Sequence, residues 1–281
     1  MAKHPAEIFG YPLRAISTKE SKAPEDYLCP FLDKRCTKQS RLINYPMGVC
    51  SVQYGEKTIA LCPNRFLQNN VVFKDIADHY FKTRNDLVVF SEIGVANTGT
   101  FDYVMVKHKP LSSDIEDFVV IEFQTGQTTG TGKLVQALED HIAGKDITGK
   151  SFGFGLNLAD IWKRSFTQIL NKGIVLESWG HKIYWVVQEP VYQDFINRYN
   201  LRNMKYKTAH KTVFVIYDLE DSDNKYQLNQ TRIRSSTIDN LFNAFRNNPN
   251  IPSIEEFVCK LESKLKAKLE LKLELSNRQS C

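Results

Sequence analysis

The sequence lacks any run of about 18 consecutive apolar residues, the length that a membrane-spanning helix requires. Its first residues, MAKHPAEIFGYP, also lack the apolar core of a signal peptide. We therefore expect a cytoplasmic protein. Because thiols stay reduced in that compartment, the six cysteines are better explained as metal ligands or buried small residues than as disulfides.

A strong excess of one charge is also missing, since 37 Lys and Arg stand against 32 Asp and Glu, for a net charge of +5. This balance is compatible with a polyanionic partner but is common in proteins that have none. A hydrophobic content of 42% over 281 residues is ordinary for a globular protein with a sizeable core. The length allows one large domain or two modest ones.

A phosphate-binding loop is absent, although the stretch VVIEFQTGQTTGTGK at 119–133 resembles one at first sight. Such a loop needs G-x-x-x-x-G-K-[ST], so that backbone N–H groups surround the phosphates and a hydroxyl reaches magnesium. Here Gly126 and Gly132 enclose five residues instead of four, and Lys133 is followed by Leu134. A nucleotide hydrolase is therefore the least favoured class.

The composition divides the chain into three regions, 1–70, 71–250 and 251–281. Residues 1–70 hold six prolines and four cysteines with only brief apolar alternation, so we expect an irregular region without its own core that needs a staple. The apolar spacing of the second region predicts helices at 71–85, 134–142 and 156–171, a short helix between the last two strands, and strands at 86–95, 100–107, 117–124, 173–178, 182–188 and 212–219.

This order of elements predicts an α/β core, in which helices pack on a mixed sheet. The third region is rich in Lys, Glu and Leu, which favours a solvated terminal helix lying on the body or on a partner subunit. Its leucines keep a four-residue spacing at 261, 265 and 269 but alternate at 271, 273 and 275, so we expect a frayed end.

Acidic residues interrupt the apolar strand at 117–124. Period-two geometry places Glu122 and Gln124 on one face, with apolar neighbours on both sides of the pleat. A lone buried carboxylate needs a cation or a hydrogen-bonding partner. A metal ion meets that need, and the alternative is an edge strand that leaves Glu122 in water.

A second carboxylate is expected beside the first. Asp102 begins the preceding strand, and an antiparallel neighbour would bring it next to Glu122. Two carboxylates and nearby carbonyls suit a hard cation such as Mg²⁺, which assists phosphodiester hydrolysis. Glu92 is a possible third acid or an ordinary surface residue at the end of its strand.

Four cysteines lie in the irregular region with the spacing C-x6-C-x13-C-x11-C. Four thiolates around one ion would form a closed structural site and supply the folding energy that this region otherwise lacks. The alternative is a set of separate buried thiols. The four residues are Cys29, Cys36, Cys50 and Cys62, whereas Cys259 and Cys281 are remote from them.

The pattern Asp-x19-Glu-x-Gln resembles the signature of the PD-(D/E)-x-K nuclease superfamily, with Phe101 in place of the proline and Gln124 in place of the lysine. The segments HPAEIFGYP, CPF, GVCSV and CPNRF, followed by these acids, resemble the NotI-type restriction endonucleases over about residues 4–130. The resemblance implies a restriction-endonuclease-like mixed sheet flanked by helices. It also implies a homodimer, part of a restriction-modification system in a bacterial or archaeal cytoplasm, that cuts GC-rich palindromic DNA with Mg²⁺.

The same resemblance implies roles for individual residues. Asp102 and Glu122 would bind the catalytic magnesium, Gln124 would position the attacking water, and Glu92 would be an additional acid. The four cysteines of the first region would hold structural iron or zinc. A neutral amide at position 124 can hold water by hydrogen bonds but adds no charge.

Several segments are candidates for DNA contacts. The loop at 125–133 could approach phosphates through Lys133 and a base edge through Gln127, or could be only a flexible connection. Basic residues also mix with Asn, Thr and Tyr at 82–86, 197–207 and 231–237, where Arg232 and Arg234 share one face of a possible strand or are simply solvated. Two alternatives to a restriction enzyme remain open: a repair or structure-specific nuclease, and a metal-stapled DNA-binding protein without catalysis.

Overall fold

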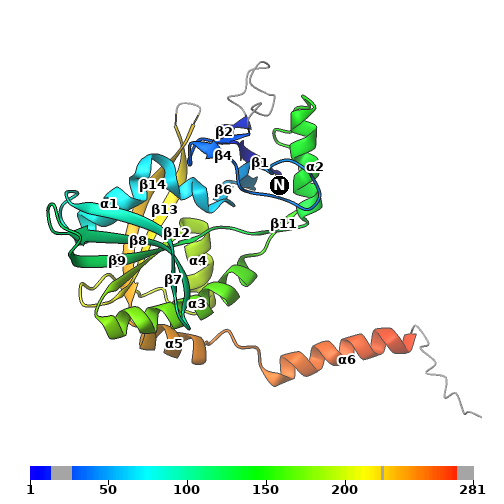
Figure 1. Cartoon of the computed structure of the whole chain (residues 1–281). Coiled ribbons are helices and arrows are strands. Elements are labelled where there is room, and N and C mark those ends of the chain that lie inside the picture. Colours follow the sequence, from blue (N-terminus) through cyan, green and yellow to red (C-terminus); the bar gives the residue numbers. More distant parts are fainter. Residues whose placement is uncertain (14–26, 223–224, 271–281) are drawn as a thin grey trace, which may run out of the picture.

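A six-stranded mixed sheet forms the centre of the molecule in the computed structural model, which describes residues 1–13, 27–222 and 225–270 and the side chains of these up to residue 266 (Figure 1). The strand order is β14-β13-β12-β9-β8-β7, with β12 parallel to both β9 and β13 and the other pairs antiparallel. The strands are β7 Leu87–Val95, β8 Gly99–His108, β9 Ile115–Gln124, β12 Lys182–Gln188, β13 Thr212–Ser222 and β14 Lys225–Ser236. The mixed α/β fold is confirmed.

Helices cover both faces of this sheet. One face packs against α3 (Leu158–Trp179), α4 (Glu189–Arg198) and α5 (Ile238–Arg246). The other packs against the 3-10 helix η2 (Pro63–Asn70) and α1 (Val71–Tyr80), which ends about a turn before the expected position. Because β12 is covered on both sides, every one of its residues is buried, as is usual for a central parallel strand.

The face assignment of β9 is confirmed. Val119, Ile121 and Phe123 pack in the cluster on the α1 side, whereas Val120 packs in the cluster on the α3 side. Glu122 therefore points toward α3. The edge-strand alternative is wrong, because β9 lies between β8 and β12 and Glu122 is only 1% exposed.

The expectation of an irregular N-terminal region is wrong. A second sheet forms there, in the order β2 (Tyr11–Pro12), β1 (Lys3–Ile8), β5 (Val49–Tyr54) and β6 (Lys57–Ala60). A small hairpin of β3 (Leu28–Cys29) and β4 (Lys34–Arg35) belongs to the same region. Its core includes Val49 and Ile59 and is completed by Leu134 and Leu138 of α2 (Thr131–Ile142). The apolar alternation was too short to predict this sheet, because part of its core comes from a distant helix.

The two sheets are joined where β9 ends. The N–H of Gly126, just after β9, donates to the carbonyl oxygen of Ala60 in β6 at 2.8 Å. The side chain of Gln188, the last residue of β12, accepts from the Ala60 N–H at 2.8 Å and donates to the Thr58 carbonyl. A Cβ at position 126 would lie 2.6 Å from Ile59, so only glycine fits this approach. Two-residue strands β10 (Thr128–Thr129) and β11 (Gly155–Leu156) pair nearby.

Helix α3 is longer than its sequence indicates. The strand expected at 173–178 is wrong, because these residues continue α3 to Trp179. Gly173 and Leu176 are buried on the same helix face as Ile169, so tertiary packing overrides the β-branched residues Ile174 and Val175.

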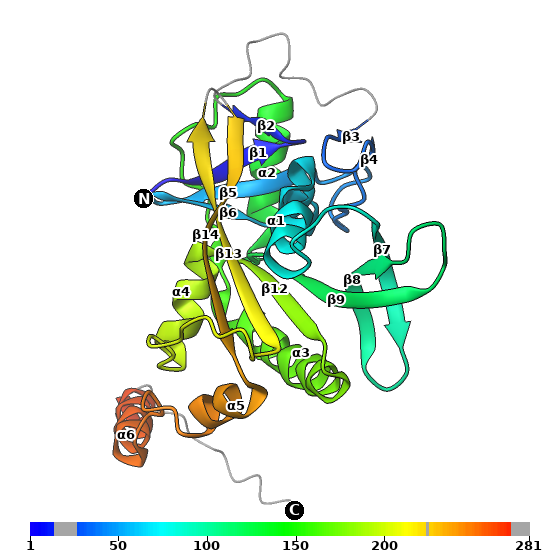
Figure 2. The ribbon, with the colours of Figure 1, turned by 90° about the vertical axis from the view of Figure 1, so that its left-hand side faces the viewer.

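The expected C-terminal helix is present as α6 (Ile254–Glu270). Every side chain described from Ile254 to residue 266 is exposed, and Figure 2 shows α6 apart from the two sheets. The alternating leucines at 271, 273 and 275 and Cys281 lie outside the described residues. Among the described helices, none combines the length and apolar character needed to cross a membrane.

Candidate active site

The site forms where the ladder between β8 and β9 stops. The last paired residues are Tyr103 and Ile121, and beyond them side chains replace the ladder hydrogen bonds. The Asp102 N–H donates to Glu122 Oε1 at 3.3 Å, and Asp102 Oδ2 accepts from the Phe123 N–H at 2.9 Å. The structure thus places the two carboxylates side by side, as the strand pattern predicts.

Glu122 has a cationic partner that sequence reasoning did not identify. Lys172 of α3 donates from Nζ to Glu122 Oε2 at 2.6 Å, and the pair is almost fully buried. Burial first, and then the Asp102 carboxylate, raise the pKa of Glu122 to about 7, while Lys172 opposes both effects. Burial likewise raises the pKa of Asp102, with the Phe123 N–H and Lys172 acting against it.

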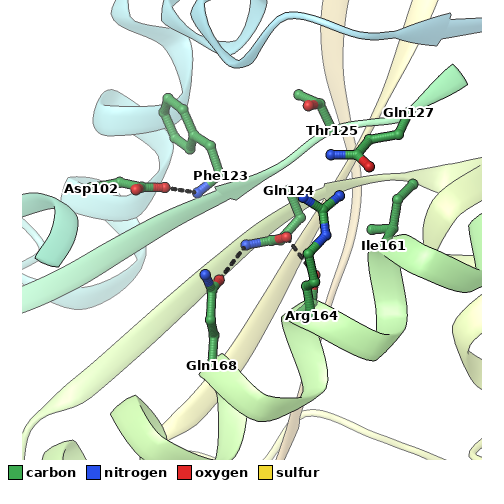
Figure 3. Close-up of a pocket in the computed structure, with 9 residues that line it drawn as sticks. Asp102, Phe123, Gln124, Thr125, Gln127, Ile161, Arg164 and Gln168 are labelled. Carbon is green, nitrogen blue, oxygen red and sulfur yellow. Dashed lines mark hydrogen bonds between the residues drawn. The ribbon is translucent and has the colours of Figure 1, made fainter. Parts of the chain in front are cut away.

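Gln124 is held by two side chains of α3. Its Oε1 accepts from the Ser165 hydroxyl at 2.5 Å, and its Nε2 donates to Gln168 Oε1 at 3.4 Å. Figure 3 shows the Gln124 amide extended between β9 and the helix. The amide therefore has a defined orientation before any ligand binds.

A pocket of about 210 Å³ opens beside these groups. It is lined by strand residues, including Asp102 and Gln124, and by α3 residues, including Arg164 (Figure 3). Arg164 is exposed, and its Nε donates to the carbonyl oxygen of Asp160 at 3.5 Å. The pocket thus combines carboxylate, amide, hydroxyl and guanidinium groups, so its polar lining offers both hydrogen-bond donors and acceptors.

Glu92 lies beside Asp102 but is exposed. In the β7–β8 pairing, Ser91 is opposite Tyr103 and Ile93 opposite Phe101, and Glu92 between them has a φ of 57°. Its charge contributes to the raised pKa of Asp102. In the part of the chain that the structure describes, no three His, Cys, Asp or Glu side chains are arranged to hold a metal ion.

The four N-terminal cysteines are all buried and are not paired in disulfides. Burial is the main cause that raises the pKa of the Cys29, Cys50 and Cys62 thiols, and charges on neighbouring cysteines raise it further. Lys38 lies next to this group, and its Nζ donates to the Leu61 carbonyl at 3.1 Å. Soft sulfur donors therefore gather in one buried region.

The residues predicted to contact DNA differ in whether their side chains are exposed or already bonded within the protein. Gln127 lines the pocket, and Lys133 is exposed in the first turn of α2, so both are accessible. Arg232 lies on β14 but forms an ion pair with Glu189, with Nε 3.1 Å from Oε2. Arg234 donates to the neighbouring Ile233 carbonyl.

The functional residues that sequence reasoning missed all lie on α3. Ser165 and Lys172 occupy the same stripe as the apolar residues Ile161, Ile169 and Leu176. A hydroxyl and an ammonium on an otherwise apolar helix face indicate polar partners inside the protein. That pattern could have been read from the sequence, but the partner strand could not.

The sheet thus carries paired carboxylates at an open strand end beside a polar pocket. The chain matches the family described as restriction endonuclease NotI over residues 7–229, which is most of its length, and it belongs to that family. Members are type II restriction endonucleases, so the class of activity is site-specific cleavage of DNA. No curated protein matches the chain.

Proposed function

We propose that the chain makes Mg²⁺-dependent double-strand cuts at a GC-rich DNA palindrome, with a glutamine variant of the PD-(D/E)-x-K site. The observation that carries the proposal is the junction of Asp102 and Glu122 at the open end of the β8–β9 ladder, beside the polar pocket. Family membership supports the reaction class. The requirement for Mg²⁺ and the preference for a GC-rich palindrome are part of our proposal.

Asp102 and Glu122 would hold the magnesium ion. Mg²⁺ in phosphoryl-transfer sites is commonly bound by one or two carboxylates, with waters and substrate phosphate as the remaining ligands, so two adjacent carboxylates suffice. When bound, such an ion neutralises charge on the phosphodiester and promotes the ionisation of water. Glu92 would add a further acidic side chain from β7, close enough to act on Asp102.

Gln124 would orient the attacking water. Its Oε1 already accepts from Ser165, but a carbonyl oxygen has two lone pairs and the Nε2 group has a second N–H. The amide can therefore bind one more group without losing its present partners. Arg164, exposed at the pocket, would bind a DNA phosphate bidentately.

Cleavage of DNA tests this assignment. Purified protein is incubated with unmethylated phage and genomic DNA in Mg²⁺ or EDTA, and the cut ends are sequenced. We expect discrete Mg²⁺-dependent fragments that share one short palindrome. Asp102→Asn and Glu122→Gln should each slow cleavage at least about a hundredfold, because each removes a ligand charge, while DNA binding persists.

Glu116→Gln is the matched control, since Glu116 lies at the far end of β9 in a partly exposed pair with Lys107. It should leave cleavage unchanged. Structure-dependent rather than sequence-dependent cuts would favour a repair nuclease. Full function in the Asp102 and Glu122 variants would favour a DNA-binding protein without catalysis.

We also propose that Cys29, Cys36, Cys50 and Cys62 hold one structural iron or zinc ion. All four thiols are buried, and neighbouring cysteines contribute to the raised pKa of Cys29, Cys50 and Cys62, which supports this. Sulfur donors suit either metal. Elemental analysis of the purified protein should find about one metal ion per chain. Cys50→Ser should lower that content and the melting temperature, whereas Cys259→Ser, on exposed α6, should change neither. A metal-free wild-type protein with full stability would contradict the proposal.

A two-fold palindrome is cut most simply by a two-fold dimer, so we propose a homodimer. Sedimentation at micromolar concentration should give twice the chain mass of 32.3 kDa. A monomer that also stays monomeric on DNA would contradict this.

A further inference from the structure

The buried lysine of α3 occupies an unusual position. Lys172 is 5% exposed, and its ammonium group has two partners, Glu122 Oε2 at 2.6 Å and the Thr100 carbonyl oxygen at 2.7 Å. Thr100 belongs to β8, two residues before Asp102. One cation therefore bridges the two strands that carry the carboxylates.

Both oxygens of Glu122 are engaged by this arrangement. Oε1 accepts from the Asp102 N–H and Oε2 accepts from Lys172. A carboxylate bonded on both oxygens keeps one orientation, and fixed orientation is what a site needs for rapid chemistry. Lys172 is thus more than a neutralising charge in the core.

The neighbouring strand position lacks a charge. Gln124, two residues after Glu122 on the same face, is neutral, and its amide is held by Ser165 and Gln168 of α3. These two residues and Lys172 line the same side of one helix. Helix α3 therefore supplies both the support for Gln124 and the positive charge beside Glu122.

We propose that Lys172 is a positioning residue for cleavage, which holds the Glu122 carboxylate and supplies from α3 the positive charge that position 124 of the strand does not carry. This inference rests on the proposed nuclease function. Its effect is electrostatic, because a fixed cation beside the Asp102 and Glu122 carboxylates offsets the repulsion between them.

Exchange of the two side chains tests the proposal. Lys172→Gln keeps hydrogen-bonding ability but removes the charge, and should lower the single-turnover cleavage rate at saturating Mg²⁺ at least about a hundredfold. Binding of the same duplex in EDTA should stay within about twofold of wild type. The double variant Gln124→Lys with Lys172→Gln returns a lysine to the face of β9, and should cleave at least about tenfold faster than Lys172→Gln.

Lys182→Gln is the matched control for the loss of a buried lysine. Lys182 is 6% exposed and donates to the carbonyl oxygens of Thr208 and His210, away from the pocket. It should lower the melting temperature without slowing cleavage by the folded protein. Lys172→Arg keeps the charge and should fold, with cleavage within about tenfold of wild type.

The outcomes separate this inference from the proposed function. If wild-type protein cleaves and Glu122→Gln does not, but Lys172→Gln cleaves within about threefold of wild type, the role of Lys172 is overturned while the nuclease stands. A loss in Lys172→Gln that the exchange does not reverse also overturns the charge role. If Lys172→Gln does not fold, Lys172→Arg becomes the test. Cleavage by Lys172→Arg as slow as that by Glu122→Gln would then overturn the charge role. Absence of cleavage by wild type would instead remove the proposed function.

Discussion

Side chains at the open end of β9 define the site more closely than the acidic motif does. Glu122 is buried and paired, Asp102 takes the place of a ladder partner, and Gln124 is held by α3. Strand periodicity was enough to predict that Asp102 and Glu122 lie side by side, because β8 and β9 are neighbours in both sequence and space. The supporting residues come from a helix about 40 to 50 positions later, and no local pattern links them to β9.

At this scale we expect Ser165→Ala to slow cleavage about tenfold, because a hydrogen bond that orients a site residue commonly contributes that much. Ser165 is 1% exposed, and its hydroxyl is the closer of the two groups that hold Gln124. Single-turnover rates and melting temperatures would be measured together. Ser178→Ala is the control, since Ser178 lies at the exposed end of the same helix and its hydroxyl donates to the Val175 carbonyl at 2.7 Å. An unchanged cleavage rate in Ser165→Ala would show that Gln124 needs no support.

Helix α3 is the element that links the core to the site. Its apolar stripe packs on the sheet, and the same stripe carries Ser165 and Lys172. The sequence indicated the first part of this helix correctly but assigned its last two turns to a strand. Ile174 and Val175 favour a strand locally, whereas burial of Gly173 and Leu176 requires the helix to continue.

Gly173 marks the contact between α3 and α5. A Cβ at this position would lie 2.2 Å from Ile238 Cδ1 and 3.0 Å from its Cγ1. Alanine gains about 1 kcal/mol of helix propensity, but overpacking a buried contact costs about 1 to 3 kcal/mol. We expect Gly173→Ala to destabilise the protein by about 1 kcal/mol net, as measured by urea unfolding.

Ile238→Val supplies the test of this contact, because it removes the methyl group that the new Cβ would meet. Alone it should cost about 1 kcal/mol. Combined with Gly173→Ala it should cost about 1 kcal/mol less than the sum of the two single changes. Strict additivity, or a Gly173→Ala protein more stable than wild type, would show that α5 shifts freely away from α3.

At the scale of the whole molecule, the sequence predicted the class of fold and most strands of the main sheet. It failed for the N-terminal sheet, where β1, β5 and β6 are short and their core is completed by α2, more than 70 residues away. Pairings of that separation leave no local periodicity. The burial of the cysteines agrees with the composition, but their convergence on a metal ion stays a prediction.

The hydrogen bonds that Ala60 forms with Gly126 and Gln188 limit the exchange of N-terminal segments between relatives. Strand β6 is hydrogen-bonded through Ala60 to Gly126, just after β9, and to Gln188 at the end of β12. The next residues after β6 are Leu61 and Cys62. A foreign N-terminal segment would need the same backbone path at residues 58–60. It would also need a side chain at position 59 that leaves room for the close approach of Gly126. The N-terminal sheet is therefore not an independent unit: a graft that did not preserve residues 58–60 would leave the end of β9 without its hydrogen bond to Ala60.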